Sequence, residues 1–543
     1  MKKRALVAFL AATMLVGSLA GCNSSGGGSS TTSTEGSSST PASTESSGEA
    51  SAEGSEAADA GDAAAEAVAN RTETQTVVVS WMNYTGAPNG MDRIVAAMDE
   101  LTIPELNLKV DMQVTDAATR SQQLTLQISG GEQLDIVQAL GISYGVGVTN
   151  GYWYDMESPD ENGNNLLTTY GSGIIDTLGQ DTIDACRAPD GTLYGVTQQK
   201  ENAQGRFALS IGTQYLENAA GSLGDLTPDL ESDVWRVDGI EDLATILKAV
   251  HNANPGIDTF APGGAQAGWT SVDSMGDYFG VLGNWGTGDI VSYFEDESYL
   301  TMVNTMRDLF NYGCISANEL TDTTSASTRV QAGSLMSYIT NYKPGSKIQE
   351  STLCGQDMTI VLGGPDFTVS NSIAGMPWCI CANTADPVAA MQYMNFMYTS
   401  PEWNELFKWG QEGVDFEEVD GTARFLENAE YNHAVQWMAP GQFLAMPEYG
   451  NPTDLWDQYE IFNDEAIKSE AVGFMFDQTP VATEYTALTN VYTQYQKSIE
   501  YGAVDPTSSL EEMKAALDSA GYQKYLDEKQ AQYTAWKEAN GNA

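Results

Sequence analysis

Residues suited to hydrolytic or metal chemistry are scarce in this sequence. Only two histidines occur among its 543 residues, His251 and His433. A zinc site built on imidazole ligands and a hydrolase driven by a serine–histidine pair are therefore not expected. A nucleophile elbow of the form G-x-S-x-G is also missing. The sequence indicates no catalytic residue and no cofactor.

A glycoside hydrolase works with a pair of carboxylates, and such a pair cannot be inferred from the number of acidic residues alone. Such an enzyme needs two carboxyl groups about 5–10 Å apart on either side of the bond that it cleaves. With 74 Asp and Glu residues, a pair can always be proposed. A surface-tethered glycoside hydrolase therefore stays an alternative without positive support.

Aromatic side chains point to binding without catalysis. The chain has 11 Trp and 25 Tyr, a generous supply of flat platforms for the apolar C–H faces of a sugar. Each stacked aromatic contributes about 1 kcal/mol beyond its burial, whereas micromolar binding requires about −8 kcal/mol. Several platforms must act together, so closure around the ligand would be part of binding.

The N-terminus has the organisation of an export signal. Lys2, Lys3 and Arg4 precede a short apolar run that is too short to span a membrane. Leu-Ala-Gly-Cys then ends at Cys22 and matches the bacterial lipobox. We expect a signal peptide over 1–22 and acylation of Cys22, which would anchor the chain at the outer face of the membrane. A plain signal peptide with an incidental cysteine is the alternative.

Residues 23–72 are rich in Ser, Gly, Thr, Ala and Glu, with almost no large apolar residue. Such a segment cannot bury enough surface to offset its ordering entropy, so it predicts a disordered, hydrated tether. A tether of this kind suits a surface receptor and a surface enzyme equally.

The length and net charge of the chain restrict the class of protein and the kinds of ligand further. A chain of 543 residues is too long for one core and predicts two lobes. Its net charge of −50 opposes nucleic-acid binding. The same charge disfavours a polyanionic ligand, unless a local basic pocket overrules the average. We expect a monomer.

Three local patterns resemble metal sites and have simpler explanations. Cys379 and Cys381 lie on one face of a predicted strand with no second Cys/His pair, which predicts buried small side chains. Residues 160–165 are calcium-like in composition but lack the EF-hand spacing, which predicts a solvated turn. The acidic run 415–420 likewise predicts a solvated loop, and no metal site is expected.

Alternating strand and helix patterns predict a βαβαβ unit near residue 76. Strands are expected over 76–81, 108–114 and 134–137, with helices over 91–101 and 122–129. The loops at the carboxyl ends of such strands form a natural ligand crevice. A further strand is expected over 206–212 and an amphipathic helix over 240–251, and the pattern beyond residue 429 is mostly helical.

An ordered set of short motifs resembles the extracellular solute-binding proteins of ABC importers. Gly-Glu-Gln-Leu-Asp-Ile-Val at 131–137 is similar to the family phrase G-E-x-x-D-I-v, and 190–196 is similar to d-G-k-x-Y-G-v-p. Further matches, the last three to the LipO-like lipoproteins, lie at 332–336, 383–398, 409–413, 473–477 and 502–506.

This resemblance implies a two-lobed α/β fold of the periplasmic-binding-protein-like type II class, with a helical C-terminal region. The first lobe would comprise 73–200 and 360–430, and the second 201–359 and 431–543. It implies a receptor on the extracytoplasmic face of a Gram-positive membrane, which captures an oligosaccharide and delivers it to an ABC transporter permease. A peptide is the alternative cargo for the same fold.

The family pattern carries ligand contacts onto the loops that follow the strands. Glycine-rich residues 263–268 favour exposure of the tryptophan that follows them. Trp285 and Trp437 are second-rank candidates, because any single aromatic can equally pack in a core. The expected ligand-binding residues are Asn83, Tyr84, Tyr144, Glu201, Asn202, Trp269, Tyr342, Trp378 and Glu412.

Overall fold

The computed structural model describes residues 53–84, 86–117, 119–264, 266–433 and 435–540. Residues 54–543 form one compact unit with two sheets, each with its own hydrophobic core. The expected signal peptide, Cys22 and most of the expected tether lie outside the described residues. Within the described part of the chain, no helix is long and apolar enough to span a bilayer.

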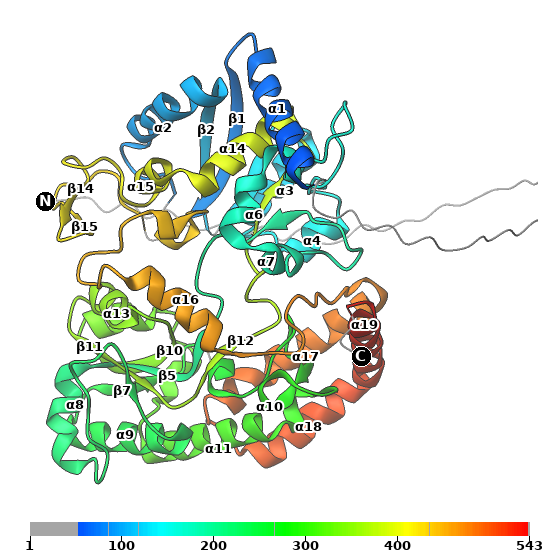
Figure 1. Ribbon diagram of the computed structural model, residues 1–543. Coiled ribbons are helices and arrows are strands. Elements are labelled where there is room, and N and C mark those ends of the chain that lie inside the picture. The colour runs from blue at the N-terminus through cyan, green and yellow to red at the C-terminus, as the bar shows by residue number, and fades with distance from the viewer. Residues whose placement is uncertain (1–52, 85, 118, 265, 434, 541–543) are drawn as a thin grey trace, which may run out of the picture. The chain divides into compact units, whose positions relative to one another are not determined.

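The first lobe contains a five-stranded sheet in the order β2-β1-β3-β13-β4. Figure 1 labels the strands β1 and β2 of this sheet. The strands β1, β2 and β3 are parallel, which confirms the predicted βαβαβ unit, and β13 runs antiparallel to both of its neighbours. The strands are β1 (Gln75–Asn83), β2 (Leu108–Asp116), β3 (Ile136–Gln138), β4 (Gly195–Val196) and β13 (Trp378–Ile380).

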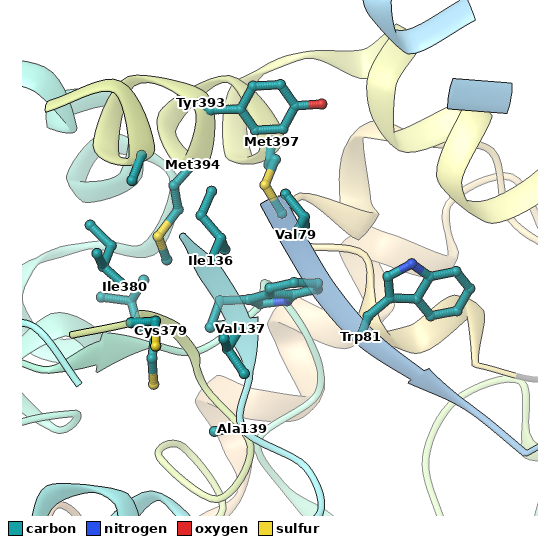
Figure 2. Close-up of a cluster of buried hydrophobic side chains, with 14 of the residues drawn as sticks. Val79, Trp81, Ile136, Val137, Ala139, Cys379, Ile380, Tyr393, Met394 and Met397 are labelled. Atoms are coloured by element: carbon teal, nitrogen blue, oxygen red, sulfur yellow. The ribbon is translucent and has the colours of Figure 1, made fainter. Parts of the chain in front are cut away.

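The helices of the first lobe cover this sheet with apolar side chains. Figure 2 shows Met394 and Met397 of α14 pointing toward Val79 and Ile136 of the sheet. The thiols of Cys379 and Cys381 are buried, as predicted, and they are unpaired. The helices are α2 (Met91–Leu106), α3 (Arg120–Gly130), α4 (Tyr144–Thr149), α5 (Leu166–Tyr170), α6 (Ser172–Leu178), α7 (Gln180–Asp184), α14 (Pro387–Thr399) and α15 (Pro401–Trp409).

Part of the expected tether is helical, so that expectation is wrong for its last residues. Helix α1 (Glu53–Asn70) packs Ala64 and Ala67 against the first core. The amide of Gln392 on α14 donates to the carbonyl of Ala64 and accepts from Arg71. Alanine is the best helix former, and two small apolar side chains on one helix face suffice when a neighbouring helix covers them.

The second lobe contains a seven-stranded sheet built around β5. The main path is β16-β12-β5-β10-β7, and β11 pairs with both β5 and β6. Strand β10 is parallel to β7 and antiparallel to β5. The strands are β5 (Gln204–Gly212), β6 (Trp235–Arg236), β7 (Asp258–Ala261), β10 (Leu335–Tyr342), β11 (Met358–Leu362), β12 (Asp366–Thr368) and β16 (Ile467–Lys468).

The C-terminal helices complete the second core, as Leu488, Met513 and Leu517 are buried in it. Two small hairpins accompany the lobes: β8 (Gly280–Leu282) with β9 (Ile290–Ser292), and β14 (Phe416–Val419) with β15 (Thr422–Phe425). The helices of this part are α8 (Thr213–Ala219), α9 (Gly239–Ala253), α10 (Gly283–Gly286), α11 (Glu297–Tyr312), α12 (Ala326–Gln331), α13 (Ser346–Cys354), α16 (Leu455–Glu465), α17 (Ala482–Glu500), α18 (Pro506–Ser519) and α19 (Tyr522–Ala539).

Three crossing segments connect the two lobes. The first crossing, 197–203, joins β4 to β5; the second, 369–377, joins β12 to β13; the third, 440–466, contains α16 and leads to β16. Two expected boundaries therefore shift. Strands β11 and β12 still belong to the second sheet, so the chain returns after 368 and not at 360. Tyr431 and Met438 are buried in the first core, so the last return begins after 439 and not at 431.

Candidate functional site

The first crossing carries a row of buried polar atoms without hydrogen-bond partners. A buried polar group left unpaired costs about 1–3 kcal/mol, so natural proteins rarely keep several in succession. A ligand rich in hydroxyl groups can satisfy such a row. Among the residues that the structure describes, the unpartnered atoms of this row are Oγ1 of Thr197, Oε1 and Nε2 of Gln198, Oε1 of Gln199 and Oε2 of Glu201.

An ion pair holds Glu201 in place. The Nζ of Lys343, one residue beyond β10, lies 2.8 Å from Oε1 of Glu201. Burial disfavours the charge on Lys343, but the Glu201 carboxylate outweighs it and raises the pKa of Lys343. Burial likewise acts against the charge on Glu201, yet Lys343 and Lys200 lower the pKa of that carboxyl below its ordinary value. The pair is therefore charged, and only one oxygen of the carboxylate is engaged.

The three crossings are hydrogen-bonded to one another around Lys200. Its ammonium donates to the carbonyl of Ser372 on the second crossing, at 2.6 Å, and to Oδ1 of Asn202. On α16, Asn463 accepts from the backbone N–H of Asn202 and donates to the carbonyl of Lys200. Burial lowers the pKa of Lys200 to about 8. Of the predicted residues, Glu201 and Asn202 thus lie at the junction of the crossings.

Lys408, a buried lysine on α15, was not among the predicted site residues. Its Nζ lies 4.4 Å from the ring centroid of Trp456 and 5.2 Å from that of Trp409. Burial lowers the pKa of Lys408 to about 7. No local pattern could have found it, because the helix α15 reads as an ordinary amphipathic segment and the contact with Trp456 spans 48 positions in sequence.

Tyr144 lines a cavity of about 660 Å³, but its hydroxyl is already engaged. That hydroxyl donates to the carbonyl of Cys186 at 2.9 Å and accepts from the backbone N–H of Tyr194 at 3.1 Å. Asn371 and Ala374 of the second crossing line the same cavity. Tyr144 therefore forms part of the cavity wall, but it is 2% exposed and its hydroxyl is not free for a ligand.

Asn83 and Tyr84 lie where β1 ends, as predicted. The Asn83 side chain donates to the carbonyl of Gly86 and accepts from the backbone N–H of Tyr84, which shapes the turn. The Tyr84 side chain is 54% exposed. A large aromatic exposed at the carboxyl end of a parallel strand is free to contact a ligand.

The predicted exposure of Trp269 is wrong, and Trp378 is also fully buried. The indole N–H of Trp269 donates to the carbonyl of Ala208 at 3.0 Å, and its ring stacks on Phe260. The indole N–H of Trp378 donates to the carbonyl of Met438 at 3.0 Å. The glycine-rich loop folds back onto the second sheet, where a large apolar side chain gains most from burial. Neither ring presents a free face in this structure.

Neither Tyr342 nor Glu412 contributes an unpartnered atom to the polar row, although Tyr342 shares a buried cluster with Ala203 of the first crossing. Tyr342 is 6% exposed and packs edge-on against Phe462 of α16, with the Arg236 guanidinium 5.7 Å from its ring. Glu412 lies in an exposed turn. The acidic run that follows is not wholly solvated as expected, because Asp415 is buried and pairs with Arg93 at 2.8 Å.

The two tryptophans that were ranked second as ligand contacts are more exposed than Trp269 and Trp378, which were ranked first. Trp285 and Trp437 stay partly exposed, as do Trp456 and Trp536. Exposure of a tryptophan depends on which segments fold over it, and that information is absent from its local sequence.

No metal centre emerges from the geometry. The described ranges contain no group of three or more His, Cys, Asp or Glu side chains suited to a metal ion. The Asp160 carboxylate accepts from the backbone N–H groups of Asn162 and Asn164 and from the hydroxyl of Tyr170. These bonds make the segment a capped turn, as predicted.

Comparisons with known proteins agree with this architecture. The chain is 22% identical over 468 residues to a carbohydrate ABC transporter substrate-binding protein of Streptococcus pneumoniae serotype 4, a match that covers 84% of this chain and 90% of that protein. A family model described as a domain of unknown function, DUF3502, matches residues 470–538.

Solved structures define the fold class. The N-glycan transport solute binding protein NgtS of Streptococcus pneumoniae superposes with a TM-score of 0.73 at 20% identity, over 85% of this chain and 98% of that one. Its complex with Man5GlcNAc gives a TM-score of 0.66 at 20% identity, over 86% and 99% of the two chains. The Streptococcus pneumoniae protein FusA with kestose gives 0.54 at 15% identity, over 86% and 100%. The fold is that of the two-lobed solute-binding proteins, with helices at the C-terminus.

Proposed function

We propose that this chain is a lipid-anchored solute-binding protein that captures an oligosaccharide between its two lobes without altering it. The observation that carries this proposal is the row of unpartnered buried polar atoms on the first crossing, which includes both polar atoms of the Gln198 amide. A sugar presents many hydroxyl groups that donate and accept at once, so it can satisfy donors and acceptors along one segment.

The chemistry of the proposed site matches this ligand class. Glu201 offers a charged acceptor and the Gln198 amide a buried donor, while Tyr84 offers an exposed aromatic face. The matched relative is named for carbohydrate import, and NgtS has been solved with Man1GlcNAc and Man5GlcNAc. A similar cargo is therefore the first to test.

The binding experiment uses the compact unit, residues 54–543. Calorimetry and thermal shift would be run with Man5GlcNAc, with kestose and with an oligopeptide mixture, and the glycan recovered after a day would be analysed by chromatography. We expect saturable binding of at least one oligosaccharide, a higher melting temperature and unchanged glycan. Shortened glycan would support the hydrolase, and binding of peptides alone would support the peptide receptor.

The proposal also includes a lipid anchor at Cys22 and delivery of the ligand to an ABC transporter permease. Acylation of Cys22 would hold the protein at the extracytoplasmic face of a Gram-positive membrane, where it would hand its ligand to an ABC transporter permease. We expect the full chain to label with a fatty-acid analogue and to sediment with membranes, whereas Cys22→Ser does neither. A labelled C22S variant would exclude this anchor.

A further inference from the structure

Lys408 of α15 carries a buried ammonium group that no carboxylate pairs with. The residue is 2% exposed, and its one hydrogen bond within the described ranges is long, 3.4 Å from Nζ to the carbonyl oxygen of Gln442. Because an ammonium has three donors, two of them lack an acceptor among the described residues. A buried charge is costly unless it is paired, and perturbed groups of this kind are concentrated at functional sites.

Hydrogen bonds hold the third crossing against α15 at this point. The backbone N–H of Met446 donates to Oε1 of Glu405 at 2.6 Å, and its carbonyl accepts from the indole N–H of Trp409 at 3.0 Å. Glu405 lies three residues before Lys408, which places the two side chains on one face of the helix. Together with the contact between Lys408 and Gln442, these bonds bring the start of the crossing beside both side chains.

Two further polar atoms at this junction are buried and have no partner. They are Nε2 of Gln442, a residue that is 4% exposed, and Oε2 of Glu405. Gln442 thus adds an unused donor and Glu405 an unused acceptor to the unused donors of Lys408. Unpaired buried polar groups are rare in native proteins, so three of them on adjoining residues require an explanation. Glu405, Lys408 and Gln442 are called the lysine cluster below.

The lysine cluster lies close to the surface and beside the Glu201–Lys343 pair. The Nζ of Lys408 is 4.4 Å from the ring centroid of Trp456, and this ring stacks on Phe443 with centroids 5.2 Å apart. Both aromatic residues are partly exposed. The charges of Lys343 and Glu201 also act on Lys408. The cluster therefore adjoins the polar row of the first crossing.

We propose that the lysine cluster is a subsite for two neighbouring hydroxyl groups of the bound oligosaccharide. The Lys408 ammonium and the Gln442 amide would donate to hydroxyl oxygens, and the free oxygen of Glu405 would accept a hydroxyl hydrogen. An anionic ligand group would meet the Glu405 carboxylate, so neutral hydroxyl groups suit this mixture of donors and acceptor better. This inference rests on the proposed function.

Binding at this subsite should take up protons above neutral pH. In the free protein, burial lowers the pKa of Lys408 to about 7, while Glu405, Glu448 and Glu201 act to raise it and Lys343 acts to lower it. A ligand oxygen that accepts from the ammonium favours the charged form. The affinity should therefore be highest below pH 7 and should fall as the pH rises above it.

The test compares Lys408→Met with Lys248→Met, which removes a lysine of α9 that also lies over a ring, that of Tyr312. Calorimetry with Man5GlcNAc and kestose, at pH 6 and pH 8 and in buffers of different ionisation enthalpy, gives the affinity and the number of protons taken up. We expect K408M to bind about tenfold more weakly at pH 6, as for the loss of one hydrogen bond to a charged group, and to take up fewer protons at pH 8 than the wild type. K248M should match the wild type in both.

Gln442→Met removes the second donor and leaves the charges in place. We expect it to weaken binding several-fold without lowering the melting temperature, because the amide nitrogen is unpaired in the free protein. Wild-type affinity in folded K408M, or in Q442M where K408M does not fold, overturns the subsite and leaves the proposed function standing. Weaker binding of K408M with unchanged proton uptake would give Lys408 a structural role and also overturn it. Failure of the wild type to bind any tested oligosaccharide overturns both.

Discussion

The ammonium of Lys343 lies 2.8 Å from one carboxylate oxygen of Glu201, and this contact joins the end of β10 to the first crossing. The other oxygen of Glu201 is buried without a partner. The pair therefore has two consequences: it stabilises the junction of the second lobe with the crossing, and it leaves the second carboxylate oxygen as an unused acceptor.

A double-mutant cycle on Glu201→Gln and Lys343→Met measures this pair. Both side chains are about four-fifths buried, so we expect a coupling of about 1–3 kcal/mol in the free energy of unfolding. Additive effects of the two changes would contradict the assignment.

The pH dependence of the same pair has a defined sign. The pKa of Glu201 is lowered from 4.5, so its contribution is present above pH 4.5 and is lost as the pH falls through the lower folded-state pKa. The raised pKa of Lys343 keeps its contribution present below pH 10.5 and removes it only in stronger alkali. We expect the acid loss of stability to be smaller in E201Q, as followed by urea unfolding.

Gln198→Met should raise the stability of the protein and weaken its binding of the ligand. It removes an amide that is buried with both polar atoms unpaired. We expect a melting temperature about 2–4 °C higher, since one kcal/mol shifts a lobe of this size by that amount, together with at least tenfold weaker oligosaccharide binding.

Gln392→Met is the matched control, because both polar atoms of that buried amide are bonded, to Ala64 and to Arg71. It should lower the melting temperature and leave binding unchanged. If Q198M also lowers the melting temperature, the row is not a set of unsatisfied groups in the free protein.

Gly502→Ala should destabilise the second lobe far more than Gly333→Ala. The two glycines have nearly equal φ, 73° and 70°, so the backbone cost of an added side chain is alike. At Gly502 the new Cβ would lie 2.2 Å from the carbonyl oxygen of Met306, whereas Gly333 faces open space. Thermal unfolding of both variants separates steric overlap from backbone strain, and equal melting temperatures would refute the packing of Gly502 against α11.

His433 should remain neutral well below the usual pH. Burial lowers its pKa from 6.5 to about 4, and its ring nitrogens contact the carbonyl of Phe407 and the backbone N–H of Val435. Stability linked to this group is full above pH 6.5 and is lost by about 3 kcal/mol as the pH falls toward 4.

Proton NMR can follow this titration directly, because the chain has only two histidines. The imidazole signal that disappears in His433→Gln belongs to His433. A midpoint near 6.5 for that signal would show that the ring is solvated.

Strand and helix patterns predicted most of the first lobe. The β-branched run that became β1 and the alternation that became β2 are local signals, and each element formed close to its expected bounds. The helical pattern expected beyond residue 429 was correct from α16 onward, whereas the described residues of 430–454 contain only two short 3-10 turns. The predicted tether extended too far along the chain, because the packing of Ala64 on α14 depends on a partner more than 300 residues away.

The candidate site was predicted only in part. Glu201 and Asn202 were identified through the family resemblance, and they lie at the junction of the crossings. Trp269 and Trp378 were ranked above Trp285, and the structure reverses their exposure. Local composition does not encode which segment covers a ring, so no reading of the neighbouring residues could have ordered these tryptophans.

By itself, the sequence determined the basic and apolar N-terminal pattern that ends in a lipobox-like motif, the acidic character, the alternation of strands and helices, and the scarcity of histidine, because each depends on residue type or on spacing along the chain. The tertiary structure alone decided which polar groups stay unpaired and which aromatic rings stay accessible. Those properties arise where 197–203, 369–377 and 440–466 meet, and burial at such a meeting point is a sum over residues that are distant in sequence.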